Sequence, residues 1–251
     1  MGPSLWLWIR RRATEGLLAG ALIGHAASPV PIAGPTATPE VLFSSSRRFA
    51  LRTCERARDA PLLAMLEDVA ARLEEALGAP LPAPAGRPWL VIVERDAGAG
   101  PPRAVREADL GTRGLGRTLR LVRPEELPPS TILVGIVAGL VARHVAKHQP
   151  PAEADSSPRW PPEWLAAGLA GTLYPGPRQA WLRRAADEWS AGQDPPLGQL
   201  LAVEIGGADE HMLPFLTALV AWLRRLPSFP RLADHLLRAA AAGTSPSCAE
   251  L

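Results

Sequence analysis

The sequence predicts an α+β fold, in which a small N-terminal sheet with one amphipathic helix is followed by a mostly helical C-terminal half. Three observations lead to this prediction. Leucines and a valine recur with helical spacing over residues 62–77. Short apolar runs typical of strands flank that helix. From residue 130 onward the apolar pattern is helical. With 47% apolar and 21% charged residues among 251, the chain can bury a sizeable core.

The elements follow in order along the chain. Residues 41–53 and the apolar run 89–93 are predicted strands, and Gly78 suits the position just after the intervening helix. The Gly-, Pro- and Arg-rich residues 96–116 are predicted to form a loop, and residues 118–122 a strand near the sheet edge. Residues 131–148 are apolar on nearly every side for three turns, which predicts a helix buried in the middle of the domain. Further helices are predicted over residues 163–173, 177–191, 212–226 and 230–242.

The N-terminus has the pattern of an export signal. Three arginines at 10–12 precede an apolar stretch at 17–27, and small residues follow at 24–28. This predicts a signal peptide or a retained N-terminal anchor over residues 1–28, followed by a Pro/Ala/Thr-rich linker over 29–40. A single domain then spans 41–245, with a sheet part at 41–123 and a helical part at 130–245. We therefore expect an exported protein, in the periplasm or outside the cell.

Cysteine and charge restrict the function classes. In an oxidising compartment a Cys54–Cys248 disulfide can form, and two free thiols are equally consistent with the sequence. Two cysteines exclude a cysteine-based zinc site. A net charge of +2 gives no reason to expect a nucleic-acid partner. No run of 18 apolar residues occurs, so no membrane span is expected beyond the N-terminal segment.

A histidine pair is the most informative feature of the predicted helix 131–148. His144 and His148 are four residues apart, so both imidazoles lie on one helix face and can reach one metal ion. Together with Arg143 and Lys147 they also occupy the last turns before Pro150. Cationic side chains there interact favourably with the helix C-terminal carbonyls and need no metal. The sequence leaves both interpretations open.

The segment after the histidine pair carries a resemblance to a known family. Residues 162–170 read PEWLAAGLA. This arrangement resembles the gluzincin (peptidase-MA-like) zinc metallopeptidases, in which a buried helix bearing HExxH precedes a helix opening with P-x-W-L-x-E-G-L-A. The resemblance covers roughly residues 40–245 in the order of elements. It implies a sheet whose edge strand lies beside the 131–148 helix, with the 163–173 helix packed against that helix.

Two residues depart from the family pattern. Carried over position by position, His144 and His148 stand at the two histidine ligands, Val145 at the general-base glutamate and Ala167 at the third-ligand glutamate. Valine cannot accept a proton and alanine cannot bind zinc, and loss of a general base alone costs about 10²–10⁴-fold in rate. The resemblance therefore implies a non-catalytic binding or structural module without a cofactor. Its partner would be a protein, a peptide or an envelope ligand, bound between the sheet half and the helical half.

Alternatives follow from the same residues. In an active zinc hydrolase with a rearranged site, Glu163, one helical turn before Ala167, would replace the missing ligand. Tyr174, the only tyrosine, could donate a hydrogen bond to an oxyanion, or it could simply pack in the core. A third alternative is an all-helical protein unrelated to peptidases.

Overall fold

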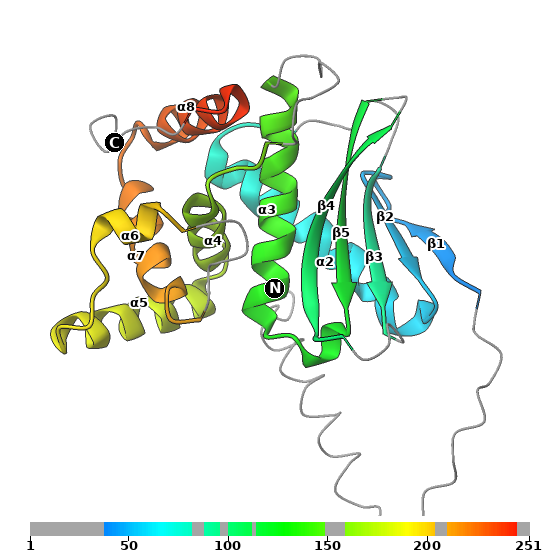
Figure 1. Ribbon diagram of the computed structural model, residues 1–251, viewed down its shortest axis with the longest axis horizontal. Coiled ribbons are helices and arrows are strands. Elements are labelled where there is room, and N and C mark those ends of the chain that lie inside the picture. The colour runs from blue at the N-terminus through cyan, green and yellow to red at the C-terminus, as the bar shows by residue number, and fades with distance from the viewer. Residues whose placement is uncertain are drawn as a thin grey trace, which may run out of the picture.

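The computed structural model describes residues 38–81, 88–95, 100–111, 114–148, 159–203 and 210–244. A mixed sheet forms the N-terminal half and helices form most of the C-terminal half, which confirms the α+β prediction (Figure 1). The predicted signal peptide or anchor, all but the last residues of the linker, and Cys248 lie outside the described residues. Cys54, the other cysteine of the predicted disulfide, is exposed.

Five strands form one sheet in the order β1-β2-β3-β5-β4. The central pairs β2–β3 and β3–β5 are parallel, and the outer pairs β1–β2 and β5–β4 are antiparallel. The connection between the parallel strands β2 and β3 contains helix α2 (Arg56–Leu77), since parallel neighbours need a long crossover. The strands are β1 (Glu40–Phe43), β2 (Phe49–Thr53), β3 (Trp89–Glu94), β4 (Arg103–Gly111) and β5 (Gly114–Val122).

The predicted first strand, 41–53, is in fact two strands separated by a turn. The hydroxyl Oγ of Ser44 accepts a hydrogen bond from the backbone N–H of Phe49 at 3.2 Å, and Oγ of Ser46 accepts one from the N–H of Arg48 at 3.1 Å. Arg47 adopts a φ of 58°. Serine hydroxyls that take backbone donors favour turns over extended pairing, and this local competition breaks the strand.

The prediction of a loop over residues 96–116 is wrong for most of its length. Residues 103–111 form β4, and β5 already begins at Gly114. β4 is an edge strand with charged residues such as Arg106 and Glu107. Edge strands commonly carry charges that prevent pairing with other chains, so this strand has the composition of a loop.

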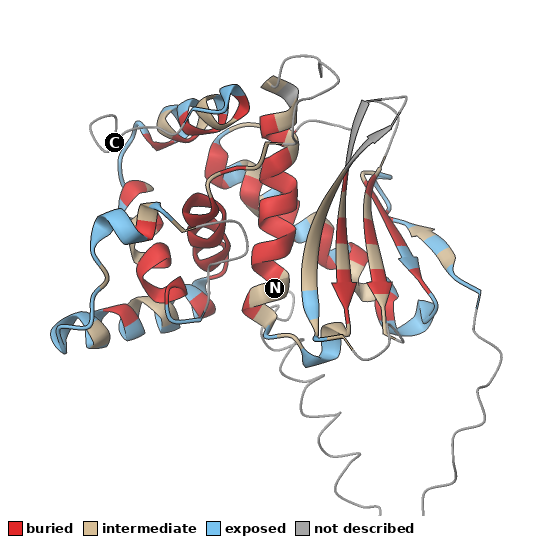
Figure 2. Ribbon diagram, in the orientation of Figure 1, coloured by how far each residue is buried: buried red, intermediate tan, exposed pale blue. Residues whose placement is uncertain are grey.

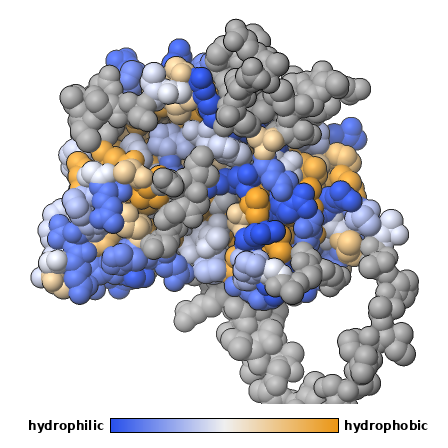
Figure 3. Space-filling view, in the orientation of Figure 1, coloured by the Kyte–Doolittle hydropathy of each residue, from blue (hydrophilic) through white to orange (hydrophobic). Residues whose placement is uncertain are grey.

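One face of the sheet is buried by helices and the other faces outward. In β3, Trp89, Val91 and Val93 are buried and alternate with partly exposed residues. On the outward face, the guanidinium of Arg120 bonds the carboxylates of Glu94 at 2.5 Å and Glu107 at 3.0 Å, which links three strands. Figure 3 shows hydrophilic and hydrophobic residues interspersed over the strands. This is the pattern of a sheet with one packed face.

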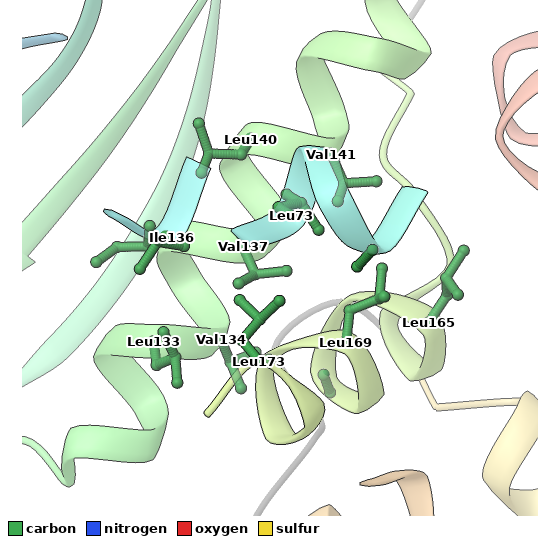
Figure 4. Packing of buried hydrophobic residues seen from close by; sticks show 14 of the residues in the cluster. Leu73, Leu133, Val134, Ile136, Val137, Leu140, Val141, Leu165, Leu169 and Leu173 are labelled. Carbon is green, nitrogen blue, oxygen red and sulfur yellow. The ribbon is translucent and has the colours of Figure 1, made fainter. Parts of the chain in front are cut away.

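Helix α3 (Pro129–His148) lies at the centre of the molecule, between the sheet and the other C-terminal helices (Figure 1). It contacts β4, β5, α2, α4 (Glu163–Thr172) and α8 (Phe229–Ala242). All residues from 133 to 142 are buried (Figure 2). Figure 4 shows Val137 pointing toward Leu73 of α2 on one side and Leu173 on the other. The prediction of a buried central helix is confirmed.

Within the described residues, α3 alone is long and apolar enough to cross a membrane. Of its segment Pro129–Ala146, 72% is buried inside the fold. Its enclosure by the sheet and the neighbouring helices accounts for that apolar composition.

The remaining helices build a second layer against α3. Helix α4 is buried along its whole length and is held between α3 and α7. A Cβ on Gly168 would lie 2.3 Å from Cγ2 of Val220 and 2.5 Å from the carbonyl oxygen of Leu216. The two helices therefore meet closely because this position has no side chain. The other elements of this half are η1 (Pro124–Glu126), α4 (Glu163–Thr172), α5 (Pro175–Ser190), α6 (Leu197–Leu201), α7 (Leu213–Leu223) and α8 (Phe229–Ala242).

We predict that Gly168→Ala lowers the free energy of unfolding by about 1–3 kcal/mol, because the added methyl group overpacks the α4–α7 contact. The thermal midpoint should fall by roughly 2–12 °C. The matched control is Gly176→Ala in α5, where nothing lies within 4 Å of the added Cβ. It should be neutral or slightly stabilising. Equal losses in both variants would contradict this account.

Candidate metal centre

Three potential metal ligands meet where α3 and α8 come together. His144 and His148 lie one turn apart on α3, with ring centroids 5.3 Å apart, as their spacing predicts. Helix α8 lies beside the C-terminal end of α3 (Figure 1) and supplies Asp234, whose Oδ1 is 3.4 Å from Nε2 of His144. One ligand atom from each of the three residues lies within 4.8 Å of the others. The sequence had not indicated Asp234, because nothing local predicts which face of α8 meets α3.

The spacing of these atoms suits zinc. Zinc binds histidine nitrogen and carboxylate oxygen at about 2.0–2.2 Å, almost always in a tetrahedron for structural sites. Two ligand atoms of such a tetrahedron are roughly 3.4 Å apart, which follows from those bond lengths. The His144–Asp234 distance already has this value, and the ligand atom of His148 lies within 4.8 Å of both.

Asp234 is held in the charged form that a metal requires. Burial acts to raise its pKa, but hydrogen bonds from Arg238 and His144 outweigh burial and lower the pKa below its ordinary value. Its Oδ2 accepts a hydrogen bond from Nε of Arg238 at 2.8 Å, while Oδ1 faces His144. His144 is 8% exposed, and its Nδ1 is buried without a hydrogen-bond partner in the described part of the chain.

Part of the predicted cationic cluster also lies at this helix end. Burial, and to a smaller extent the charge of Arg48, lower the pKa of Arg143 to about 10. Because Asp234 faces His144, the cluster contains a carboxylate as well as cations. A purely cationic helix end would therefore not describe this site, because it leaves out the carboxylate of Asp234.

Val145 and Ala167 stand at the positions of the general base and the third ligand in the family resemblance. Both side chains are fully buried in the apolar core. An ionised carboxylate at either position would lose its hydration without a partner, which is strongly unfavourable. The local environment is therefore that of packed core at both positions.

Glu163 is engaged elsewhere. Its Oε2 accepts a hydrogen bond from Nη1 of Arg106 on β4 at 2.7 Å, and the two side chains are 1% and 7% exposed. This buried ion pair joins the edge strand to the start of α4. Among the described residues, the carboxylate that groups with the two histidines is that of Asp234. Glu163 would have to leave Arg106 to act as a metal ligand.

Tyr174 points toward α2. Its hydroxyl donates a hydrogen bond to Oδ2 of Asp68 at 2.7 Å, and the guanidinium of Arg72 lies 4.6 Å from its ring centroid. Burial raises the pKa of Tyr174 above its ordinary value, and the charge and hydrogen bond of Asp68 raise it further. These surroundings fit the second of the two roles considered for Tyr174, packing in the core.

Comparisons with known proteins do not identify a family for this chain. The chain matches no protein-family model, and no curated protein or solved structure is significantly similar to it. The function is therefore inferred from the geometry of the site.

We predict that Glu163→Gln lowers the free energy of unfolding by about 3–5 kcal/mol, because it leaves the buried charge of Arg106 unpaired. Urea unfolding in the presence of a chelator measures this loss without a contribution from metal. The control is Arg184→Ala, which removes an exposed ion pair with Glu188 and should cost less than about 1 kcal/mol. A Glu163→Gln variant as stable as the parent chain would show that the pair contributes little.

We also predict that Tyr174 stays protonated in the folded protein well above pH 10. Because its pKa is raised by folding, its contribution to stability is complete below the ordinary tyrosine pKa of about 10 and is lost as the pH rises above it. Tyr174 is the only tyrosine, so tyrosinate absorbance reports it alone. Asp68→Asn should lower the midpoint of this titration. A midpoint near 10 in the folded parent chain would refute the prediction.

Proposed function

We propose that this chain is an exported, non-catalytic binding module with the architecture of a degenerate gluzincin. The observation that carries the proposal is the full burial of Val145 and Ala167 in the apolar core. Peptidase chemistry needs a carboxylate beside the first histidine to take a proton from metal-bound water. In the described residues, the carboxylate that groups with the two histidines is that of Asp234, which comes from α8 and not from the position beside His144.

The arrangement of elements supports the proposed ancestry. The edge strand β4 contacts α3, and α4 packs against the same helix. This is the arrangement that the resemblance implies. The sheet rules out the all-helical alternative.

A hollow in the helical half supports a binding role. It has a volume of about 330 Å³ and lies between the end of α4 and helices α5 and α7, whereas the expected ligand site lay between the sheet half and the helical half. Arg178, Arg224 and Arg225 line it, and none of the three forms an ion pair within the described part of the chain. Burial and then the charge of Arg178 lower the pKa of Arg224, while the charge of Glu75 raises it. Arg224 also donates a hydrogen bond to the hydroxyl of Thr172 at 3.1 Å.

The chemistry of this hollow suits an acidic peptide. Guanidinium groups bind carboxylates through paired hydrogen bonds, and Leu182 and Ala221 supply apolar surface for a side chain. A peptide is also the class of molecule that the gluzincin architecture handles. The proposed module would thus bind a peptide and leave it intact.

The test is a library of acidic and neutral peptides incubated with the purified chain, with cleavage and binding followed on the same samples. We expect binding of acidic peptides without cleavage, whether zinc or chelator is present. Arg178→Ala with Arg225→Ala should weaken binding at least about tenfold, since charge-assisted hydrogen bonds are each worth roughly 1.5–3 kcal/mol. Arg231→Ala, an exposed arginine outside the hollow, is the control.

Three outcomes would contradict the proposal. Zinc-dependent, chelator-sensitive cleavage would favour the active hydrolase that uses His144, His148 and Glu163. Failure of acidic peptides to bind, or unchanged binding by the double arginine variant, would remove the hollow as the ligand site.

A further inference from the structure

We propose that His144, His148 and Asp234 form a binding site for a divalent transition metal of the zinc class, which fastens α8 to α3. The inference does not depend on the proposed loss of peptidase activity or on the resemblance to peptidases. It rests on side chains that the tertiary structure brings together from two helices.

The donor set is that of zinc. Zinc binds both imidazole nitrogen and carboxylate oxygen, which are the donor atoms of these three residues. Calcium and magnesium instead prefer oxygen ligands alone. One donor atom from each residue already lies within 4.8 Å of the others, and the His144–Asp234 separation of 3.4 Å equals a tetrahedral edge.

The carboxylate of Asp234 is oriented by a second partner. Its Oδ2 is bonded to Arg238, one turn further along α8, and this leaves Oδ1 directed at His144. Outer partners of this kind fix a ligating carboxylate in position. A metal can therefore bind Oδ1 without displacing Arg238.

The position of the site decides its role. Asp234 follows the buried Ala233 at the edge of the apolar face of α8, so it stands where that helix meets the end of α3. Its side chain is 42% exposed, so solvent reaches the carboxylate and a water molecule can complete the ligand set. A metal here joins the last described helix to the central one.

The experiment uses the full chain, without an affinity tag containing histidine, after removal of metal by chelator. Zinc is titrated by calorimetry, and the thermal midpoint is measured with and without it. We expect one zinc per chain. At a zinc concentration of about 100 times the dissociation constant, the midpoint should rise by roughly 5–11 °C. Cobalt in place of zinc should give the absorption bands of a tetrahedral or five-coordinate site.

Variants identify the ligands. Asp234→Asn and His148→Ala should each weaken zinc binding by more than the 10–100-fold typical of losing an outer partner. His235→Ala, the exposed histidine next to Asp234 on the same helix, should bind zinc as the parent chain does. Because Asp234 is partly exposed, Asp234→Asn should fold normally without metal, and its metal-free thermal midpoint checks this.

Parent affinity in Asp234→Asn, or the absence of zinc binding by the parent chain, would overturn the proposal. Loss of zinc in Glu163→Gln together with its retention in Asp234→Asn would transfer the site to Glu163. The peptide assay does not depend on zinc binding, so the two proposals fail separately.

Discussion

The enclosure of α3 is the constraint on which the rest of the structure depends. A helix that is apolar on nearly every side must be covered on nearly every side, and the sheet, α2, α4 and α8 provide this cover. Glycines allow the closest approaches. A Cβ on Gly139 would lie 2.3 Å from Cζ2 of Trp89, so the helix can cross this strand residue only because position 139 has no side chain. Polar residues occur where the helix leaves the core, and this places the two histidines beside α8.

The same enclosure limits the chemistry. His144 faces Asp234 on α8, whereas its neighbour Val145 is fully buried. A residue adjacent to a ligand on a helix points in a different direction, and here that direction is apolar core. The packing that stabilises α3 therefore disfavours a general base at position 145, and the histidine pair is left with a carboxylate from another helix.

Polar contacts join the sheet to the helical half. Arg106 of the edge strand pairs with Glu163 at the start of α4. Cζ of Arg117 on β5 lies 4.7 Å from the ring centroid of Trp160. Burial lowers the pKa of Arg117 to about 10. The buried Arg106–Glu163 pair tolerates few alternative arrangements, because separation leaves one of its charges unpaired. This pair therefore fixes how the edge strand packs against α4.

The sequence by itself determined the local features of this protein. It predicted the buried central helix, the C-terminal glycine of α2, and the common face of His144 and His148, because these depend on spacing along one segment. It also showed that positions 145 and 167 carry valine and alanine, which neither accept a proton nor bind zinc. Only the tertiary structure decided that residues 103–111 form an edge strand and that Asp234 meets His144. It also decided that Glu163 pairs with Arg106. These contacts join segments far apart in the chain, and local periodicity carries no information about which distant side chain fills a given position.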